Sequence, residues 1–184
     1  MNRDDELYRQ FLGGKTSAYD ELMIRYGDSL TFYLYGYLHN WQDAEDLMIE
    51  AFARIMVKKP RIREGGFKAY LYKTARNLAS RFHSRESRAE IFSLEGAEKE
   101  LADSTLLEDH LQEKEKNCIL HLCLERIDPE LREALWLVYF EDLSYEDAAG
   151  VMGVSKKRVD KLLQRGKEIL RTELEKEGIT NAHE

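Results

Sequence analysis

Hydrophobic side chains recur at three- and four-residue steps along most of this chain, the spacing of one buried helix face. In the first half, the pattern predicts helices over residues 3–12, 16–38, 40–56 and 67–88. In the second half, it predicts helices over about 113–126 and 130–141, followed by two helices between Ser144 and Leu170. The sequence therefore predicts an all-α fold: two small helical modules joined by a linker, the C-terminal one containing a helix-turn-helix.

The segment from Ser144 to Leu170 has the clearest local signals. Ser144 and Ser155 can each accept a backbone N–H at the start of a helix, and Gly153 suits the intervening turn because glycine tolerates positive φ. The second helix has one apolar stripe, formed by Val159, Leu162, Leu163, Gly166, Ile169 and Leu170. Two helices joined by so tight a turn predict a helix-turn-helix, whose second helix can enter the major groove of DNA.

The first turn of that second helix is cationic, with Lys156, Lys157 and Arg158. The helix dipole disfavours cations there by about 0.3–1 kcal/mol each, so a helix optimised only for stability would have acids instead. A phosphate ligand would explain the inversion, and Lys161 and Arg165 extend the same charge. An ordinary corner between two helices is the alternative, and the negative charge of Asp160 weighs against DNA binding.

Asn40 can cap a predicted helix that runs to Met56 and has an apolar side and an acidic side. Its apolar side is formed by Ala44, Leu47, Met48, Ala51, Phe52, Ile55 and Met56, all expected to be buried. Asp43, Asp46, Glu50 and Arg54 line the other side, and Ile49 is expected to point outward among the acids. An isolated exposed Ile is common in proteins, yet within an acidic face it is also typical of a protein-docking surface.

The loop 58–66 and the following helix form a cationic region. Pro60 ends the preceding helix, and two glycines loosen the exit of the loop. On the helix we expect a buried side of Phe67, Tyr70, Leu71, Thr74, Ala75, Leu78, Ala79 and Phe82. The opposite side consists of Lys73, Arg76, Asn77, Ser80, Arg81, Ser84, Arg85 and Arg88. Because this side lacks the acids at i,i+4 that usually neutralise a solvated basic face, we interpret it as a track for nucleic-acid phosphates.

Charge is unevenly distributed along the chain, whose net charge is −7. Residues 58–88 contain ten basic and two acidic residues, whereas the weakly periodic stretch 89–112 is acidic and is predicted to be a linker. The segregation suggests contact with nucleic acid at two places and with something else elsewhere. No apolar run is long enough to span a bilayer, and the acidic N-terminus favours a cytoplasmic protein without membrane insertion.

Catalytic and metal-binding interpretations have little support. Cys118, His121 and Cys123 could begin a zinc site, but one helix would place the two cysteines on diverging faces, and no fourth ligand is evident. Cysteines so spaced are better explained as reduced thiols in a helix. No glycine-rich phosphate loop and no pairing of a nucleophile with a base is present, so we expect a non-enzyme without a metal or cofactor.

Four stretches together resemble one family. Residues 14–26, 43–56, 67–77 and 143–159 resemble, in order and spacing, the extracytoplasmic-function (ECF) sigma factors of bacterial RNA polymerase, which belong to the sigma-70 family. The resemblance covers nearly the whole chain. It implies a protein that binds core RNA polymerase and directs promoter-specific initiation of transcription.

The resemblance also implies a division of labour. Residues 1–88 would be sigma region 2, 89–112 an acidic linker threading toward the polymerase active-site channel, and 113–184 sigma region 4. Expected partners are the β′ clamp helices and β flap of core RNA polymerase, promoter DNA and an anti-sigma factor. The residues implied for core-polymerase binding are Asp43, Asp46, Ile49 and Glu50. Those for the melted, single-stranded −10 element are Lys58, Arg61, Arg63, Lys73, Arg76, Asn77, Arg81, Arg85 and Arg88. Those for the −35 duplex are Ser155, Lys156, Lys157, Arg158, Lys161 and Arg165.

Reading a melted strand requires that a base leave the stack and enter a pocket while its phosphates are gripped alongside. We expect the loop 58–66 to form that pocket, with Asn77 and Lys73 at its floor.

The sequence departs from the family pattern at three places. Ile49 stands where the family usually has Gln, and the run from Asp160 to Leu162 replaces a more basic and polar one. Gly166 stands where the family favours Ala and costs about 1 kcal/mol of helix propensity. The rival interpretation is a stand-alone helix-turn-helix regulator, which would bind duplex operator DNA tightly without polymerase.

Overall fold

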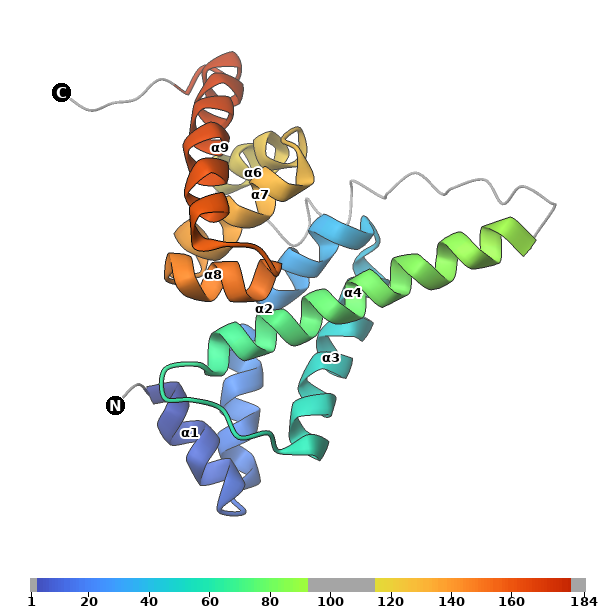
Figure 1. Ribbon diagram of the computed structural model, residues 1–184, viewed down its shortest axis with the longest axis vertical. Coiled ribbons are helices and arrows are strands. Elements are labelled where there is room, and N and C mark those ends of the chain that lie inside the picture. The colour runs from blue at the N-terminus through green and yellow to red at the C-terminus, as the bar shows by residue number, and fades with distance from the viewer. Residues whose placement is uncertain (1–2, 93–114, 180–184) are drawn as a thin grey trace. The chain divides into compact units, whose positions relative to one another are not determined.

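The structure is a computed structural model that describes residues 3–92 and 115–179, and every regular element in these two ranges is helical. The chain divides into two compact units between Ala102 and Asp103, and each is described by itself (Figure 1). The predicted fold class, all-α with two helical modules, is confirmed.

In its described residues, 3–92, the N-terminal unit has four helices (Figure 1). They are α1 (Arg3–Leu12), α2 (Thr16–Leu38), α3 (Trp41–Lys58) and α4 (Phe67–Phe92). The predicted cap of α3 is confirmed, because the side chain of Asn40 accepts the N–H of Asp43 at 3.0 Å. α4 is one turn longer than expected, ending at Phe92 rather than near Arg88.

The core of this unit is rich in aromatic side chains from all four helices. Tyr19 stands edge-on to Phe52, and its hydroxyl donates a 2.5 Å hydrogen bond to the Phe52 carbonyl. Burial raises the pKa of Tyr19 above its ordinary value, so the hydroxyl keeps its proton. Tyr72 is completely buried, packs against Tyr33 and has its hydroxyl 3.0 Å from that of Ser29.

The buried arc of α4 differs from the predicted one. It contains Tyr72, which the three- and four-residue steps had left out, whereas Tyr70 and Thr74 are only partly buried. The rotation occurs because α2 covers the Tyr72 side, where Tyr33 and Ser29 receive its ring and hydroxyl. On α3, the expectation that Met56 is buried is wrong: its side chain is 45% exposed near the C-terminal end of the helix.

Between residues 115 and 179, the C-terminal unit has four α-helices and one wider turn (Figure 1). They are α6 (Glu115–Glu125), α7 (Pro129–Leu135), the π-helical turn η1 (Trp136–Phe140), α8 (Tyr145–Met152) and α9 (Lys156–Lys176). The single helix expected over 130–141 therefore widens in its second half, where the N–H of Glu141 donates to the carbonyl of Trp136.

The predicted start signals of the helix-turn-helix are confirmed. The Ser144 hydroxyl accepts the N–H of Asp147 at 3.1 Å, and the Ser155 hydroxyl accepts the N–H of Arg158 at 3.2 Å. Gly153 adopts φ 69°, a left-handed conformation that glycine tolerates, so the predicted turn at this residue is confirmed.

Gly166 has a packing role. A Cβ built at this position would lie 3.1 Å from Cδ1 of Leu135, so the absence of a side chain allows α9 to approach α7 closely. This contact offsets the loss of helix propensity that the sequence indicated. None of the helices described has both the length and the apolar character needed to cross a membrane.

Candidate nucleic-acid interface

The polar side of α4 presents its charges to solvent. Lys73, Asn77, Arg81 and Arg85 are exposed, and Arg76 is partly buried. Among the described residues, no carboxylate forms an ion pair with Lys73, Arg81 or Arg85. Arg88 belongs to the same helix, but its side chain lies outside the described part of the structure. Lys73, Arg81 and Arg85 therefore have no carboxylate partner within the described part of the chain, and nucleic-acid phosphates could neutralise them.

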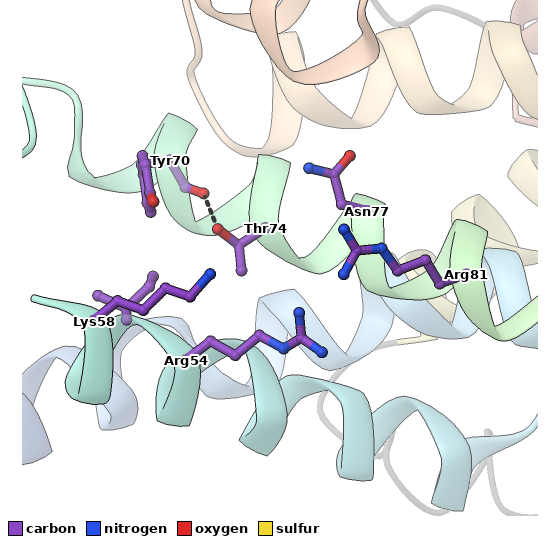
Figure 2. Close-up of a pocket in the computed structure, with 7 residues that line it drawn as sticks. Arg54, Lys58, Tyr70, Thr74, Asn77 and Arg81 are labelled. Atoms are coloured by element: carbon purple, nitrogen blue, oxygen red, sulfur yellow. Dashed lines mark hydrogen bonds between the residues drawn. The ribbon is translucent and has the colours of Figure 1, made fainter. Parts of the chain in front are cut away.

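A pocket of about 160 Å³ lies between α3 and α4 (Figure 2). It is lined by Arg54, Ile55, Lys58, Tyr70, Thr74, Asn77 and Arg81. Figure 2 shows Arg54 and Lys58 reaching from α3 toward α4. Thr74 donates its hydroxyl proton to the Tyr70 carbonyl at 2.8 Å, which fixes its orientation on the pocket wall. Cations around a partly aromatic hollow suit an unstacked nucleotide with its phosphate.

The loop that follows α3 borders a different cavity. This second cavity, of about 170 Å³, lies between the loop and α1 and includes Arg61, Ile62, Arg63, Tyr8 and Phe67 in its wall. Lys73 lines neither cavity, and Asn77 lines only the one between α3 and α4. Lys58, the first residue of the predicted loop, lines the cavity with Asn77, whereas Arg61 and Arg63 line the cavity beside α1.

The acidic side of α3 is an outward-facing surface. Ile49 is 52% exposed, Asp46 is exposed, and Asp43 and Glu50 are partly exposed. Glu50 forms an ion pair of 2.6 Å with Arg54, whereas Asp46 accepts a 3.3 Å hydrogen bond from Gln42. Partial burial, followed by the charge of Asp46, raises the pKa of Asp43 above its usual range. Carboxylates crowded around an exposed Ile suit a cationic partner with an apolar patch.

The helix-turn-helix presents most of its expected contact residues. Ser155 caps α9, and the side chains of Lys156, Lys157, Lys161 and Arg165 are exposed along that helix. Asp160 accepts a 3.2 Å hydrogen bond from Gln164 on its own helix. The exposed face of α9 is therefore cationic, although one acid lies within it.

Arg158 differs from the other cations of α9 because it already has a carboxylate partner. Its Nη2 and Nε lie 2.5 and 3.2 Å from the two carboxylate oxygens of Glu130 on α7. Asp128 and Glu130 border a cavity of about 360 Å³ together with Arg158, Lys161 and Arg165. An Arg held by both oxygens of a carboxylate must leave it before it can bind a phosphate or a base edge.

Sequence reasoning missed two features of these surfaces. Arg54 and Lys58 stand four residues apart on α3, and Tyr70, Thr74, Asn77 and Arg81 are spaced by three or four residues on α4. This spacing could have predicted that each set lies on one side of its helix. The pair between Glu130 and Arg158 joins residues 28 positions apart, and no local pattern announces it.

The zinc alternative gains no support. Among the residues that the structure describes, no group of three or more His, Cys, Asp or Glu side chains could hold a metal ion. Cys123 is buried as a free thiol, and burial raises the pKa of that thiol. The side chains of Cys118 and His121 lie outside the described residues.

Comparison with known protein families gives two matches. Residues 22–89 match the family model for sigma-70 region 2, and residues 119–170 match the model for sigma-70 region 4. The first match contains α3, the loop after it and most of α4, and the second contains α8 and most of α9. Both candidate surfaces therefore fall within matched segments.

Individual proteins agree with these matches. The ECF RNA polymerase sigma factor SigE of Mycolicibacterium smegmatis is 28% identical over 166 residues, which cover 90% of this chain and 65% of that protein. The chain therefore spans slightly less than two thirds of the length of that relative. The RNA polymerase sigma-H factor of Pseudomonas aeruginosa is 27% identical over 83% of each chain.

Two solved structures have the same fold. CnrH, in complex with the cytosolic domain of CnrY, superposes with a TM-score of 0.63 at 18% identity, covering 95% of this chain and 98% of that one. The sigma factor RpoE of Bartonella quintana, in complex with the anti-sigma factor NepR, gives a TM-score of 0.62 at 20% identity, covering 85% and 96%.

Proposed function

This chain belongs to the ECF sigma factors of the sigma-70 family, and from that premise we propose that it binds core RNA polymerase and directs promoter-specific initiation of transcription. In this proposal, residues 1–88 act as region 2, residues 89–112 as an acidic linker and residues 113–184 as region 4. The observation that carries the proposal is the cationic face of α4 beside an acidic, partly apolar face on α3 of the same unit.

Docking on the polymerase comes first. Asp43, Asp46 and Glu50 meet the β′ clamp helices, and Ile49 adds an apolar contact where the family usually has Gln. Charges of opposite sign accelerate the encounter and exclude wrong orientations, while the burial of Ile49 slows dissociation. The negative charge of the chain also opposes binding of DNA by the free protein.

In this proposal, the cationic side of α4 and the loop after α3 bind the −10 element as its strands separate. The outer cations Lys73, Arg76, Arg81, Arg85 and Arg88 hold the phosphates of one strand. A base that leaves the duplex enters the pocket between α3 and α4, where Tyr70 offers an aromatic surface and Asn77 can hydrogen-bond a base edge. Lys58, Arg61 and Arg63 hold the strand as it passes the loop. Unstacking costs a few kcal/mol, and these contacts, made only to the separated strand, offset that cost.

Recognition of the −35 duplex falls to α9. Its first turn enters the major groove, where Ser155, Lys156 and Lys157 contact phosphates and Lys161 and Arg165 extend along the backbone. Arg158 can bind guanine with both nitrogens of its guanidinium once it leaves Glu130. The β flap of the polymerase holds this module at the −35 position.

The proposal also assigns the chemical step to the polymerase and includes an inhibitory partner. Bond formation belongs to the polymerase, so the chain acts as an initiation factor and not as an enzyme, in the cytoplasm where transcription takes place. An anti-sigma factor is a further proposed partner, since the RpoE structure that shares this fold contains one.

A run-off transcription assay tests the proposal. Core polymerase is incubated with a genomic promoter library, with and without the purified chain, and the transcripts are sequenced. We expect new start sites that share a −35 and a −10 motif at constant spacing. Transcripts unchanged by the chain would contradict the proposal.

A further inference from the structure

The loop between α3 and α4 has few backbone partners of its own. Eight residues, Lys59 to Gly66, connect the two helices, and Pro60 has no N–H to donate. Lys59 and Gly65 have φ values of 44° and 71°, so the chain turns sharply at both ends of the loop. A loop of this kind holds one conformation only if something outside it fixes the backbone.

α1 supplies the first fixed point. The hydroxyl of Tyr8 donates a 2.8 Å hydrogen bond to the carbonyl of Pro60, 52 residues away in the sequence. Tyr8 is 5% exposed and packs its ring against Phe67, with 5.3 Å between ring centroids. Burial raises the pKa of Tyr8 to about 12, so the hydroxyl keeps its proton and donates throughout the physiological range.

α1 also supplies the second fixed point, at the other end of the loop. The carboxylate of Asp5 accepts the N–H of Gly65 at 2.8 Å. The next residue, Gly66, donates its own N–H to the Arg63 carbonyl at 3.0 Å, and a Cβ at Gly66 would lie 2.8 Å from Cγ of Arg63. The turn is therefore tight, and Asp5 holds it where the chain is about to enter α4.

α1 is itself anchored to the body of the unit. Asp4 is buried and bonds to both Arg25 and Tyr26 of α2, while Arg3 forms a 2.5 Å ion pair with Glu21. At the other end of α1, the ammonium of Lys59 lies 5.2 Å from the centre of the Phe11 ring. The helix thus connects both ends of the loop to α2 (Figure 1).

We propose that α1 determines how the loop 59–66 presents Arg61 and Arg63 to the melted −10 strand, with Asp5 and Tyr8 as positioning residues. Both arginines lie between the two fixed points, Pro60 and Gly65, so the path of this short backbone sets where their side chains project. The inference rests on the proposed function, and it assigns to α1 a part in promoter selectivity although α1 contains none of the expected DNA-contact residues.

The test measures opening of −10 variants by the full chain with core polymerase. Templates share one −35 element and differ by a single −10 base, and opening is followed by permanganate reactivity of unpaired thymines. Asp5→Ala removes the acceptor of the Gly65 N–H, and Tyr8→Phe removes only a hydroxyl. Asp5→Asn keeps an acceptor oxygen without the charge. Glu6→Ala is the matched control, because Glu6 is an exposed acid on the same turn that bonds Gln10.

We expect Asp5→Ala and Tyr8→Phe each to slow opening of the preferred −10 element roughly threefold to tenfold, the scale of one lost hydrogen bond. The ratio of opening rates between preferred and substituted elements should fall, while affinity for core polymerase stays unchanged. Asp5→Asn should restore the ratio, and Glu6→Ala should leave it at the wild-type value.

Two outcomes would overturn the inference. If Asp5→Ala and Tyr8→Phe lower thermal stability but keep the wild-type ratio, α1 only stabilises the fold. If Asp5→Asn behaves like Asp5→Ala, the charge matters and the hydrogen bond does not.

Failure of the proposed function has a different signature, because the wild-type chain would then open no template. In that case hydrogen exchange of the Gly65 amide in the free chain decides whether α1 fixes the loop. Faster exchange in Asp5→Ala, restored in Asp5→Asn, supports that role, and equal exchange in all variants rejects it.

Discussion

Three cations on α4 and Arg158 at the start of α9 have the same sign of charge but different surroundings. Lys73, Arg81 and Arg85 have no carboxylate partner among the described residues, whereas Arg158 is held by both oxygens of Glu130. A cation without an ion pair can bind a phosphate directly. An arginine that is paired with a carboxylate must first break that ion pair before it can bind DNA. Within the proposed function, we therefore expect the α4 cations to contribute mainly to affinity for a melted strand and Arg158 to contribute to discrimination among duplex sequences.

Both surfaces are expected to work only after α3 docks, so breaking the docking face should have the largest effect. Asp46→Lys places a cation opposite the basic partner that we propose, and like charges at an interface cost several kcal/mol. We expect at least about a 100-fold loss of affinity for core polymerase in a fluorescence titration, and loss of opening at both promoter elements. Asp46→Asn should lose much less. Undiminished binding by Asp46→Lys would remove α3 from the interface.

The α4 side of the comparison is tested by removing two cations that have no carboxylate partner among the described residues. Lys73→Ala combined with Arg81→Ala should slow promoter opening roughly tenfold, because contacts with strand phosphates are lost. Affinity for core polymerase should not change, and Ser80→Ala with Ser84→Ala is the uncharged control on the same face. A parallel drop in polymerase binding would assign this basic face another role.

The α9 side of the comparison is tested by weakening the ion pair between Arg158 and Glu130. Glu130→Gln removes the charge of its partner and should strengthen binding to −35 duplex roughly twofold to fivefold, the range for an exposed ion pair. Discrimination between the preferred −35 sequence and a substituted one should weaken. The measurement is a competition titration of sigma-loaded polymerase with both duplexes. Weaker binding by Glu130→Gln would mean that the pair positions Arg158 for DNA.

A smaller effect is expected in the salt dependence of DNA binding, which should differ between variants of Lys157 and Arg158. Replacing Lys157 with Ala removes a cation that has no ion pair within the described ranges, and it should lower the slope of log affinity against log salt by about one. Arg158→Ala should lower that slope by less, since Glu130 already neutralises its charge before DNA binds. Equal slopes for the two variants would contradict the contrast between free and paired cations.

The sequence predicted the local part of this molecule well. The bounds of α1 and α2, the caps at Asn40, Ser144 and Ser155, and the turn at Gly153 follow from side chains that act within a few residues. The cationic and acidic faces also follow, because helical periodicity fixes which residues share a side.

The features that could not be predicted from the sequence depend on contacts between residues far apart in the chain. Periodicity shows that a helix has an apolar side but does not show which helix covers it, so Tyr72 and Met56 were misplaced. The pairing of Glu130 with Arg158 and the two bonds from α1 to the loop span 28 to 60 residues. Such contacts arise only when packing brings the elements together, and they form the part of the site that the structure adds.

The dependence of promoter binding on core polymerase tests the central claim most directly. The affinity of the purified chain for one selected promoter duplex is measured by fluorescence anisotropy, alone and with saturating core polymerase, at a fixed salt concentration. We predict that binding by the free chain is at least about 100-fold weaker, because its acidic surface repels DNA and its two cationic surfaces are not held in register. Equal affinity in the two conditions would contradict the account and indicate a stand-alone regulator.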